Sequence, residues 1–113
     1  MKSKILALSK NEDFKSLLKK RKVSNKFVTI FFGKLSGKDI KKLNISFVTK
    51  RKIGNAVKRN KIKRRLRNIT NEAVKKVSIN FNYSFLVIAK PTMLNNDYLN
   101  IKETLFKDFE RIK

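Results

Sequence analysis

The chain has 113 residues, and its 30 Lys and Arg against 8 Asp and Glu give a formal net charge of +22, which favours an anionic partner such as a polyphosphate. Its hydrophobic content of 41%, with nine Phe but only three Gly and one Pro, excludes a disordered basic tail and predicts one folded domain over residues 1–113. No apolar run reaches the ~20 residues of a membrane span, and the N-terminal segment lacks the apolar length of a signal peptide, so we expect a cytoplasmic protein.

The first predicted element is a short amphipathic helix over about residues 12–20. Ser9 and Asn11 are rival N-caps, and Glu12 stands three residues after Ser9, the spacing of a capping box. Three apolar residues at positions i, i+3 and i+4 form a stripe that should pack against the core: Phe14, Leu17 and Leu18.

Three apolar segments predict the strands of a mixed sheet. Residues 26–32 are rich in β-branched and aromatic side chains, and residues 43–49 alternate partly between apolar and polar. Turn residues between these two segments suggest a hairpin-like pair. Residues 84–90 form a nearly continuous apolar run that ends before Pro91, which is typical of a strand covered on both faces.

Two longer helices complete the predicted order of helix, two strands, helix, strand, helix. A helix over about residues 55–77 carries an apolar stripe of helical period: Ile62, Leu66, Ile69 and Ala73. A last helix, with Asn95, Asn96 and Asp97 as candidate caps, places five apolar residues on one face: Tyr98, Ile101, Leu105, Phe109 and Ile112.

The span of residues 40–71 contains cations but no acidic residue: Lys41, Lys42, Lys50, Arg51, Lys52, Lys58, Arg59, Lys61, Lys63, Arg64, Arg65 and Arg67. A solvated helix face is the ordinary explanation of a charge run, but such faces usually mix signs. Here Arg59 with Lys63, and Lys63 with Arg67, are like-charged pairs that destabilise an isolated helix by ~0.2–0.5 kcal/mol each. The amide of Asn60 can bond a base edge or a sugar hydroxyl. The pattern favours RNA, and the lack of a short preceding helix disfavours a helix-turn-helix on DNA.

The segment Gly54-Asn55-Ala56-Val57, followed by Arg59-Asn60-Lys61-x-Lys63-Arg64-x-x-Arg67, resembles the signature of the bacterial ribonuclease P protein family. Three other segments are similar to that family: Asn-Glu-Asp-Phe at residues 11–14, Arg-Lys at residues 51–52 and Leu-Val-Ile-Ala-Lys-Pro at residues 86–91. The resemblance extends in order and spacing over nearly the whole chain.

This resemblance implies a two-layer α/β (α+β) sandwich, in which a mixed four-stranded sheet packs with helices and contains a left-handed β-α-β crossover, similar to a ribosomal-protein domain. It therefore adds a fourth, short strand around residues 22–24. It also implies an endoribonuclease subunit that helps a catalytic RNA remove the 5′ leader from precursor tRNA. Magnesium ions held mainly by the RNA would supply the chemistry, in agreement with the lack of His and Cys in the chain.

The implied partners are ribonuclease P RNA and the precursor tRNA leader, bound by a protein monomer in a 1:1 complex without DNA or membrane. No catalytic residue is expected on the protein, and no residue is assigned to a metal. The implied contacts to the catalytic RNA are Arg59, Asn60, Lys61, Lys63, Arg64 and Arg67. The implied contacts to the leader are Phe14, Leu18, Ile30, Arg51, Lys52 and Lys90.

Four of these positions need comment. Lys61 replaces the arginine more usual in the family, which keeps the charge but loses bidentate geometry. Leu18 and Ile30 stand where the family often has aromatic residues, which should reduce stacking. Phe14 is expected either to stack on a base or to pack in the core.

Two other classes of protein compete with this interpretation. A non-catalytic ribosomal or ribosome-assembly protein would share the charge and the fold type, but it would not depend on a leader. A DNA-compacting basic protein has no obvious use for an aromatic-rich sheet or for the motif asparagine. Cleavage of precursor tRNA with the cognate RNA separates the first interpretation from both others.

Overall fold

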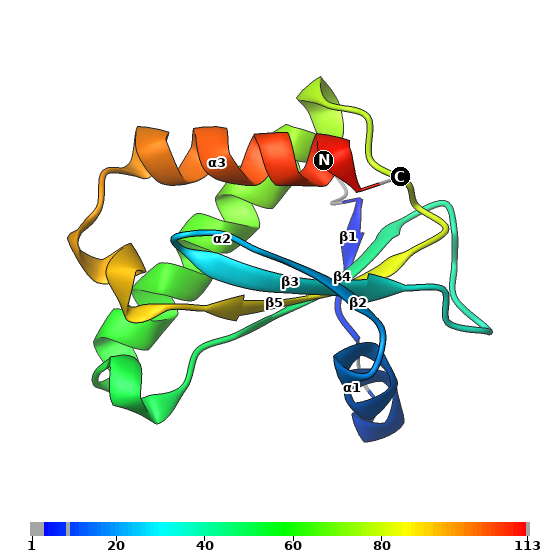
Figure 1. The fold of residues 1–113 in the computed structure, drawn as a ribbon, viewed down its shortest axis with the longest axis horizontal. Helices are drawn as coiled ribbons and strands as arrows, with labels where there is room; N and C mark the ends of the chain where they lie inside the picture. The colour runs from blue at the N-terminus through cyan, green and yellow to red at the C-terminus, as the bar shows by residue number, and fades with distance from the viewer. Residues whose placement is uncertain (1–3, 9, 113) are drawn as a thin grey trace.

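The chain folds around a mixed sheet with helices on both faces, as a computed structural model shows for residues 4–8 and 10–112 (Figure 1). The strands are β1 (Ile5–Leu6), β2 (Arg21–Ser24), β3 (Val28–Gly33), β4 (Leu43–Val48) and β5 (Ser84–Ala89). The α-helices are α1 (Asn11–Leu18), α2 (Ala56–Lys76) and α3 (Tyr98–Arg111), and the 3₁₀ helices are η1 (Arg51–Ile53) and η2 (Pro91–Asn95). The predicted α+β sandwich is confirmed, with α1 as a cover on the second face of the sheet.

Strand β5 occupies the centre of the sheet, whose order within the described residues is β1-β4-β5-β3-β2. β4 and β5 are parallel and are joined through α2, because a parallel pair needs a long crossover connection. β3 is antiparallel to β5. The predicted hairpin-like pairing of residues 26–32 with residues 43–49 is therefore wrong, because β5 separates the two strands. β5 is buried along most of its length, as predicted for residues 84–90. The handedness of the crossover stays a prediction.

The described sheet has five strands, where four were expected. The strand expected around residues 22–24 is confirmed as β2, which pairs with β3. The additional strand is β1, in which Ile5 and Leu6 pair in parallel with Leu43 and Asn44. Two residues are too short to produce a readable alternation, so this strand carries no sequence signal.

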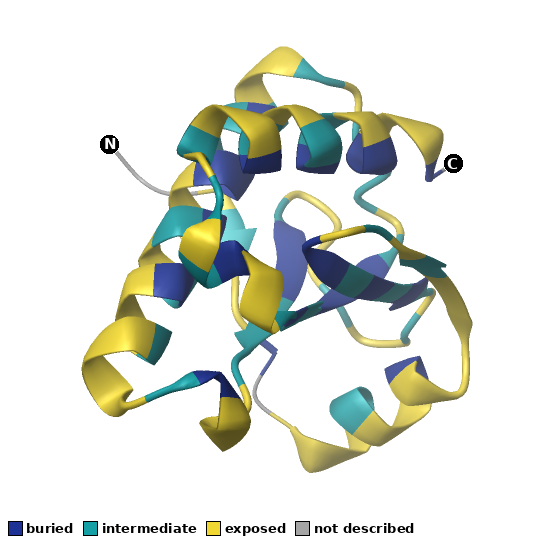
Figure 2. Cartoon of the chain, turned by 60° about the vertical axis from the view of Figure 1, so that its left-hand side comes forward, coloured by how far each residue is buried: buried dark blue, intermediate teal, exposed yellow. Residues whose placement is uncertain are grey.

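Alternation along the strands divides the apolar residues between two clusters. Side chains on the face toward α2 and α3 form the larger core, which includes Ile30, Phe85 and Phe109. Side chains on the other face form a smaller cluster with α1, built around Leu17 and Leu86. Figure 2 shows the buried parts of α2 and α3 turned toward the sheet and their outer surfaces exposed. Helices α2 and α3 therefore cover most of one face of the sheet, whereas α1 covers only part of the other.

The long helix α2 begins and ends where the sequence predicts. The backbone N–H of Lys58 donates to Asn55 Oδ1 at 3.0 Å, so Asn55 is a true N-cap, and Val77 is the C-cap. The predicted stripe is buried, with Leu66 and Ile69 fully inside the core. The predicted apolar face of α3 also lies against the core, and Asp97 occupies the N-cap position.

Helix α1 differs from its prediction at both ends. Lys10 is the N-cap and Asn11 is already helical, so Asn11 is not a cap, while Ser9 lies outside the described residues. The helix ends at Leu18 instead of residue 20, because the chain turns there into β2. The shorter helix buries Leu17 but leaves Leu18 49% exposed, so the expectation that Leu18 packs in the core is wrong.

Candidate nucleic-acid interface

The face of the sheet beside α1 carries an accessible strip of side chains. Thr29, Ile88 and Val48 form one row across β3, β5 and β4, because Thr29 pairs with Ile88 and Val48 pairs with Ile88. All three side chains are half-buried. This row can support an extended chain, since its members are neither sealed in the core nor fully solvated.

Cations border this strip at the end of the parallel strands. β4 and β5 end at the same edge of the sheet, so η1, which follows β4, and Lys90, which follows β5, lie at that edge. Arg51 and Lys52 of η1 are exposed. Lys90 Nζ donates to Ser24 Oγ at 2.8 Å and to the carbonyl oxygen of Asn25, so β2 and the following turn hold its position.

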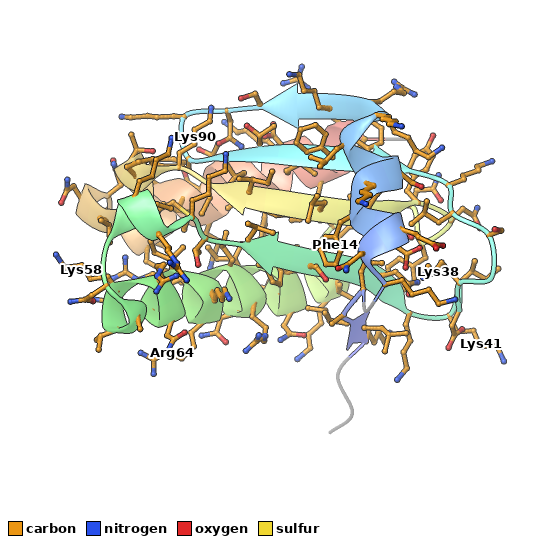
Figure 3. The ribbon with its side chains drawn as sticks, turned by 90° about the horizontal axis from the view of Figure 1, so that it is seen from below. Phe14, Lys38, Lys41, Lys58, Arg64 and Lys90 are labelled. Atoms are coloured by element: carbon orange, nitrogen blue, oxygen red, sulfur yellow. The ribbon has the colours of Figure 1, made fainter. Side chains whose placement is uncertain are left out.

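Phe14 borders the strip at the end covered by α1, away from Lys90 (Figure 3). It is half-buried and packs against the small cluster around Leu17 and Leu86. Part of the ring is therefore packed and part is accessible, so both roles expected of Phe14 are compatible with its position. Figure 3 also shows Lys38 near α1, where it pairs with Asp13.

Ile30 cannot take part in this surface. Its side chain is 0% exposed and belongs to the core beneath α2 and α3, so its assignment to the leader surface is wrong. The next residue, Phe31, points to the α1 face, where it is half-buried, and Lys22 Nζ lies 6.0 Å from its ring centroid. Phe31 is the aromatic residue that the sequence interpretation missed. Because residues 28–32 have no regular alternation of apolar and polar side chains, the sequence alone does not indicate whether Ile30 or Phe31 faces α1.

The motif residues of α2 spread over about half of the helix circumference, opposite its buried stripe. Asn60, Lys61, Arg64 and Arg67 are exposed, whereas Arg59 and Lys63 are half-buried. Arg64 projects away from the sheet (Figure 3). In the described part of the chain, ion pairs join Lys38 to Asp13 and Lys102 to Glu72, so no motif cation is neutralised by a carboxylate. The helix therefore presents an unbalanced positive surface.

The two surfaces expected for different RNAs meet at the outer edge of β4. A cavity of about 240 Å³ is lined by Phe14 of α1, by Ser46 and Val48 of β4, and by Lys63 and Arg67 of α2. Lys61 does not line this cavity. It lies two residues before Lys63, and two residues along an α-helix turn the side chain by about 200°, to the other side of the helix. Phe14 and two motif cations, which lie far apart in sequence, therefore border one hollow.

An ion pair lies near the other end of α2. Lys102 Nζ donates to Glu72 Oε2 at 2.9 Å, and this hydrogen bond holds the pKa of Glu72 below its ordinary value of 4.5. The same bond raises the pKa of Lys102. Tyr98 lies nearby, and burial, followed by the charge of Glu72, raises its pKa. The acid-free surface therefore ends at Glu72.

The described residues contain no group of three or more His, Cys, Asp and Glu that could hold a metal ion. The described residues therefore offer no cluster of ligands that would enclose a magnesium ion on the protein alone. None of the described helices is long and apolar enough to cross a membrane.

The family model described as Ribonuclease P matches residues 3–113. The chain belongs to the ribonuclease P protein family. It is 30% identical over 102 residues to the ribonuclease P protein component of Carboxydothermus hydrogenoformans, covering 87% of this chain and 83% of the relative. It is 28% identical over 106 residues to that of Mycoplasma mycoides, covering 94% of each.

Solved structures of the family share the fold. The RNase P protein from Thermotoga maritima superposes with a TM-score of 0.79 and 25% identity, covering 96% of this chain and 98% of that one. The RNase P protein from Staphylococcus aureus superposes with a TM-score of 0.76 and 28% identity, covering 94% of this chain and 93% of that one. These likenesses support a role in tRNA processing through RNA binding and do not support the ribosomal alternative.

Proposed function

We propose that the chain is the protein subunit of ribonuclease P and helps a catalytic RNA to remove the 5′ leader from precursor tRNA. The observation that carries the proposal is the hollow at the edge of β4, which brings the unneutralised cations of α2 next to the accessible sheet face. One protein can thus bind a structured RNA on α2 and a single strand on the sheet.

In this proposal the leader lies across the sheet face, from Phe14 to the cations that follow the ends of β4 and β5. A base can stack on the accessible part of Phe14 or Phe31, which stabilises single-stranded nucleic acid without sequence preference. Arg51, Lys52 and Lys90 attract the leader phosphates. Lys90 is already fixed by Ser24 and Asn25, so less side-chain entropy is lost when it binds.

The helix α2 binds the catalytic RNA with the cations on its exposed sides, and Arg64 points directly outward. Guanidinium groups bind phosphate oxygens in bidentate geometry, which fixes orientation as well as adding attraction. The protein contributes position and charge, and the proposal assigns the hydrolytic water and its magnesium ions to the RNA. The protein binds as a monomer in a 1:1 complex, in the cytoplasm.

The deciding experiment is 5′ cleavage of a precursor tRNA by the cognate ribonuclease P RNA at low magnesium, with and without the protein. We expect stimulation by the protein, lost in Arg64→Ala/Arg67→Ala and kept in the matched control Lys75→Ala/Lys107→Ala. Both control lysines are exposed and lie outside the motif. A folded protein that fails to stimulate its cognate RNA would refute the proposal.

A further inference from the structure

A second cavity, of about 210 Å³, lies between α2 and η2. Three cations of α2 line it: Lys58, Lys61 and Arg65. Their spacing of three, four and seven residues places them on one side of the helix. Figure 3 shows Lys58 at the N-terminal end of α2, well away from Phe14. The cavity is therefore separate from the hollow at the edge of β4.

The three cations of this cavity converge without compensation. No acidic residue lines the cavity, and the ion pairs of the described residues involve other side chains. Neighbouring like charges at these spacings destabilise the helix unless an anion approaches. This arrangement is suited to a phosphodiester.

The rest of the lining is three apolar residues and one amide, which a site for phosphate alone would not need. Ile62 and Met93 form a buried floor, Leu94 is half-buried, and Asn95 is exposed at the rim. The half-buried Leu94 can support the flat face of a base above this floor, and the Asn95 amide can both donate to and accept from a base edge. Bases inside an RNA duplex are stacked and cannot enter such a cavity, whereas an unpaired base can.

We propose that this cavity holds one unpaired nucleotide of the catalytic RNA, with its phosphodiester at Lys58, Lys61 and Arg65 and its base against Leu94. The inference rests on the proposed function and adds a site to it. The leader is the less suitable occupant, because the cavity lies on the side of α2 away from Phe14 and the accessible sheet strip.

Crosslinking tests the site directly, because the chain has no Cys and a single introduced thiol is unique. Asn95→Cys carrying an aryl azide is bound to the catalytic RNA and irradiated. We expect one dominant crosslink, at an unpaired nucleotide. The matched control is Lys107→Cys, an exposed position on α3, which should give no crosslink at that nucleotide.

A double-mutant cycle tests the stacking contact. Replacing the crosslinked nucleotide by an abasic one should weaken binding of the unmodified protein by about tenfold. The same replacement should have little further effect on Leu94→Ala or on Lys58→Ala/Arg65→Ala. Equal losses in all proteins would overturn the inference.

The outcomes separate this inference from the proposed function. A complex that assembles and cleaves normally, but crosslinks at many nucleotides or at none, would overturn the nucleotide site alone. A protein that neither binds nor stimulates the catalytic RNA would overturn the proposed function and this inference with it.

Discussion

At the scale of single residues, Phe14 combines packing with accessibility, and the two contributions can be separated. Phe14→Leu retains apolar contact with the cluster around Leu17 but removes the aromatic face. We expect about 5- to 150-fold weaker binding of precursor tRNA, because base stacking contributes ~1–3 kcal/mol. The measurement compares the dissociation constants of substrates with and without a leader. An equal loss for both substrates would contradict a leader contact.

The neighbours Ile30 and Phe31 provide a matched pair, because they point to opposite faces of β3. Ile30→Val should cost about 0.5–1.5 kcal/mol of unfolding free energy and leave leader affinity unchanged. Phe31→Leu should weaken leader binding more than it lowers stability. Chemical denaturation and the same pair of substrates give both quantities. The prediction fails if Ile30→Val selectively weakens binding of the leader.

The ion pair of Glu72 with Lys102 gives a pH dependence of known sign. The pKa of Glu72 is depressed in the folded protein, so its contribution to stability is present above its ordinary value of 4.5 and is lost as the pH falls through the depressed pKa. Glu72→Gln should therefore lower the thermal midpoint at neutral pH. The difference from the parent protein should vanish in acid. A difference that persists at the lowest pH would exclude this charge effect.

The sequence predicted the site residues unevenly for a physical reason. Exposed cations such as Arg51, Lys52 and Arg64 can be identified by composition, because charge is rarely buried. Residues 28–32 are apolar on both faces, so only the partners of β3 decide that Ile30 faces the core and Phe31 faces α1. The sequence identifies Arg65 only as one cation of a basic run. The cavity that it lines is formed together with η2, which lies far away in sequence.

At the scale of secondary-structure elements, α2 serves two surfaces, and its residues should differ in what they affect. Lys63→Ala should weaken both assembly with the catalytic RNA and leader binding, because Lys63 borders the hollow beside Phe14. Arg64→Ala should weaken assembly alone, since Arg64 points outward. Titrations with and without a leader measure the two effects. Identical leader dependence in both variants would contradict the shared hollow.

The helices were predictable within a few residues, whereas the strand order was not. Helix α2 is specified locally, by Asn55 at its start and by the apolar stripe along it. The pairing of β3 with β5 joins residues 28–33 to residues 84–89, and nothing within either segment indicates its partner. Sequential strands usually pair, and that expectation led to the wrong hairpin.

At the scale of the whole molecule, the charge of +22 opposes folding in the free protein. Added salt should therefore raise the thermal midpoint, because it screens repulsion between exposed cations. Salt should weaken RNA binding at the same time, with a log-log slope of about 0.7–0.9 per phosphate contact. In Lys63→Gln/Arg67→Gln, both the thermal midpoint and the RNA affinity should depend less on salt than in the parent protein. A midpoint that does not change with ionic strength would show that repulsion costs little.

The central position of β5 has a consequence for synthesis of the chain on the ribosome. β3 and β4 are complete after about 48 residues, yet neither has its inner neighbour until residues 84–89 have emerged. The nascent chain therefore holds two open strand edges while α2 is being made, and long-range pairing of this kind forms slowly. The helix can meet RNA while the strand pairs β1-β4 and β2-β3 are still separate, whereas the leader surface is assembled only when β5 inserts between them. During synthesis the cationic surface of α2 therefore forms before the sheet surface that would bind a leader.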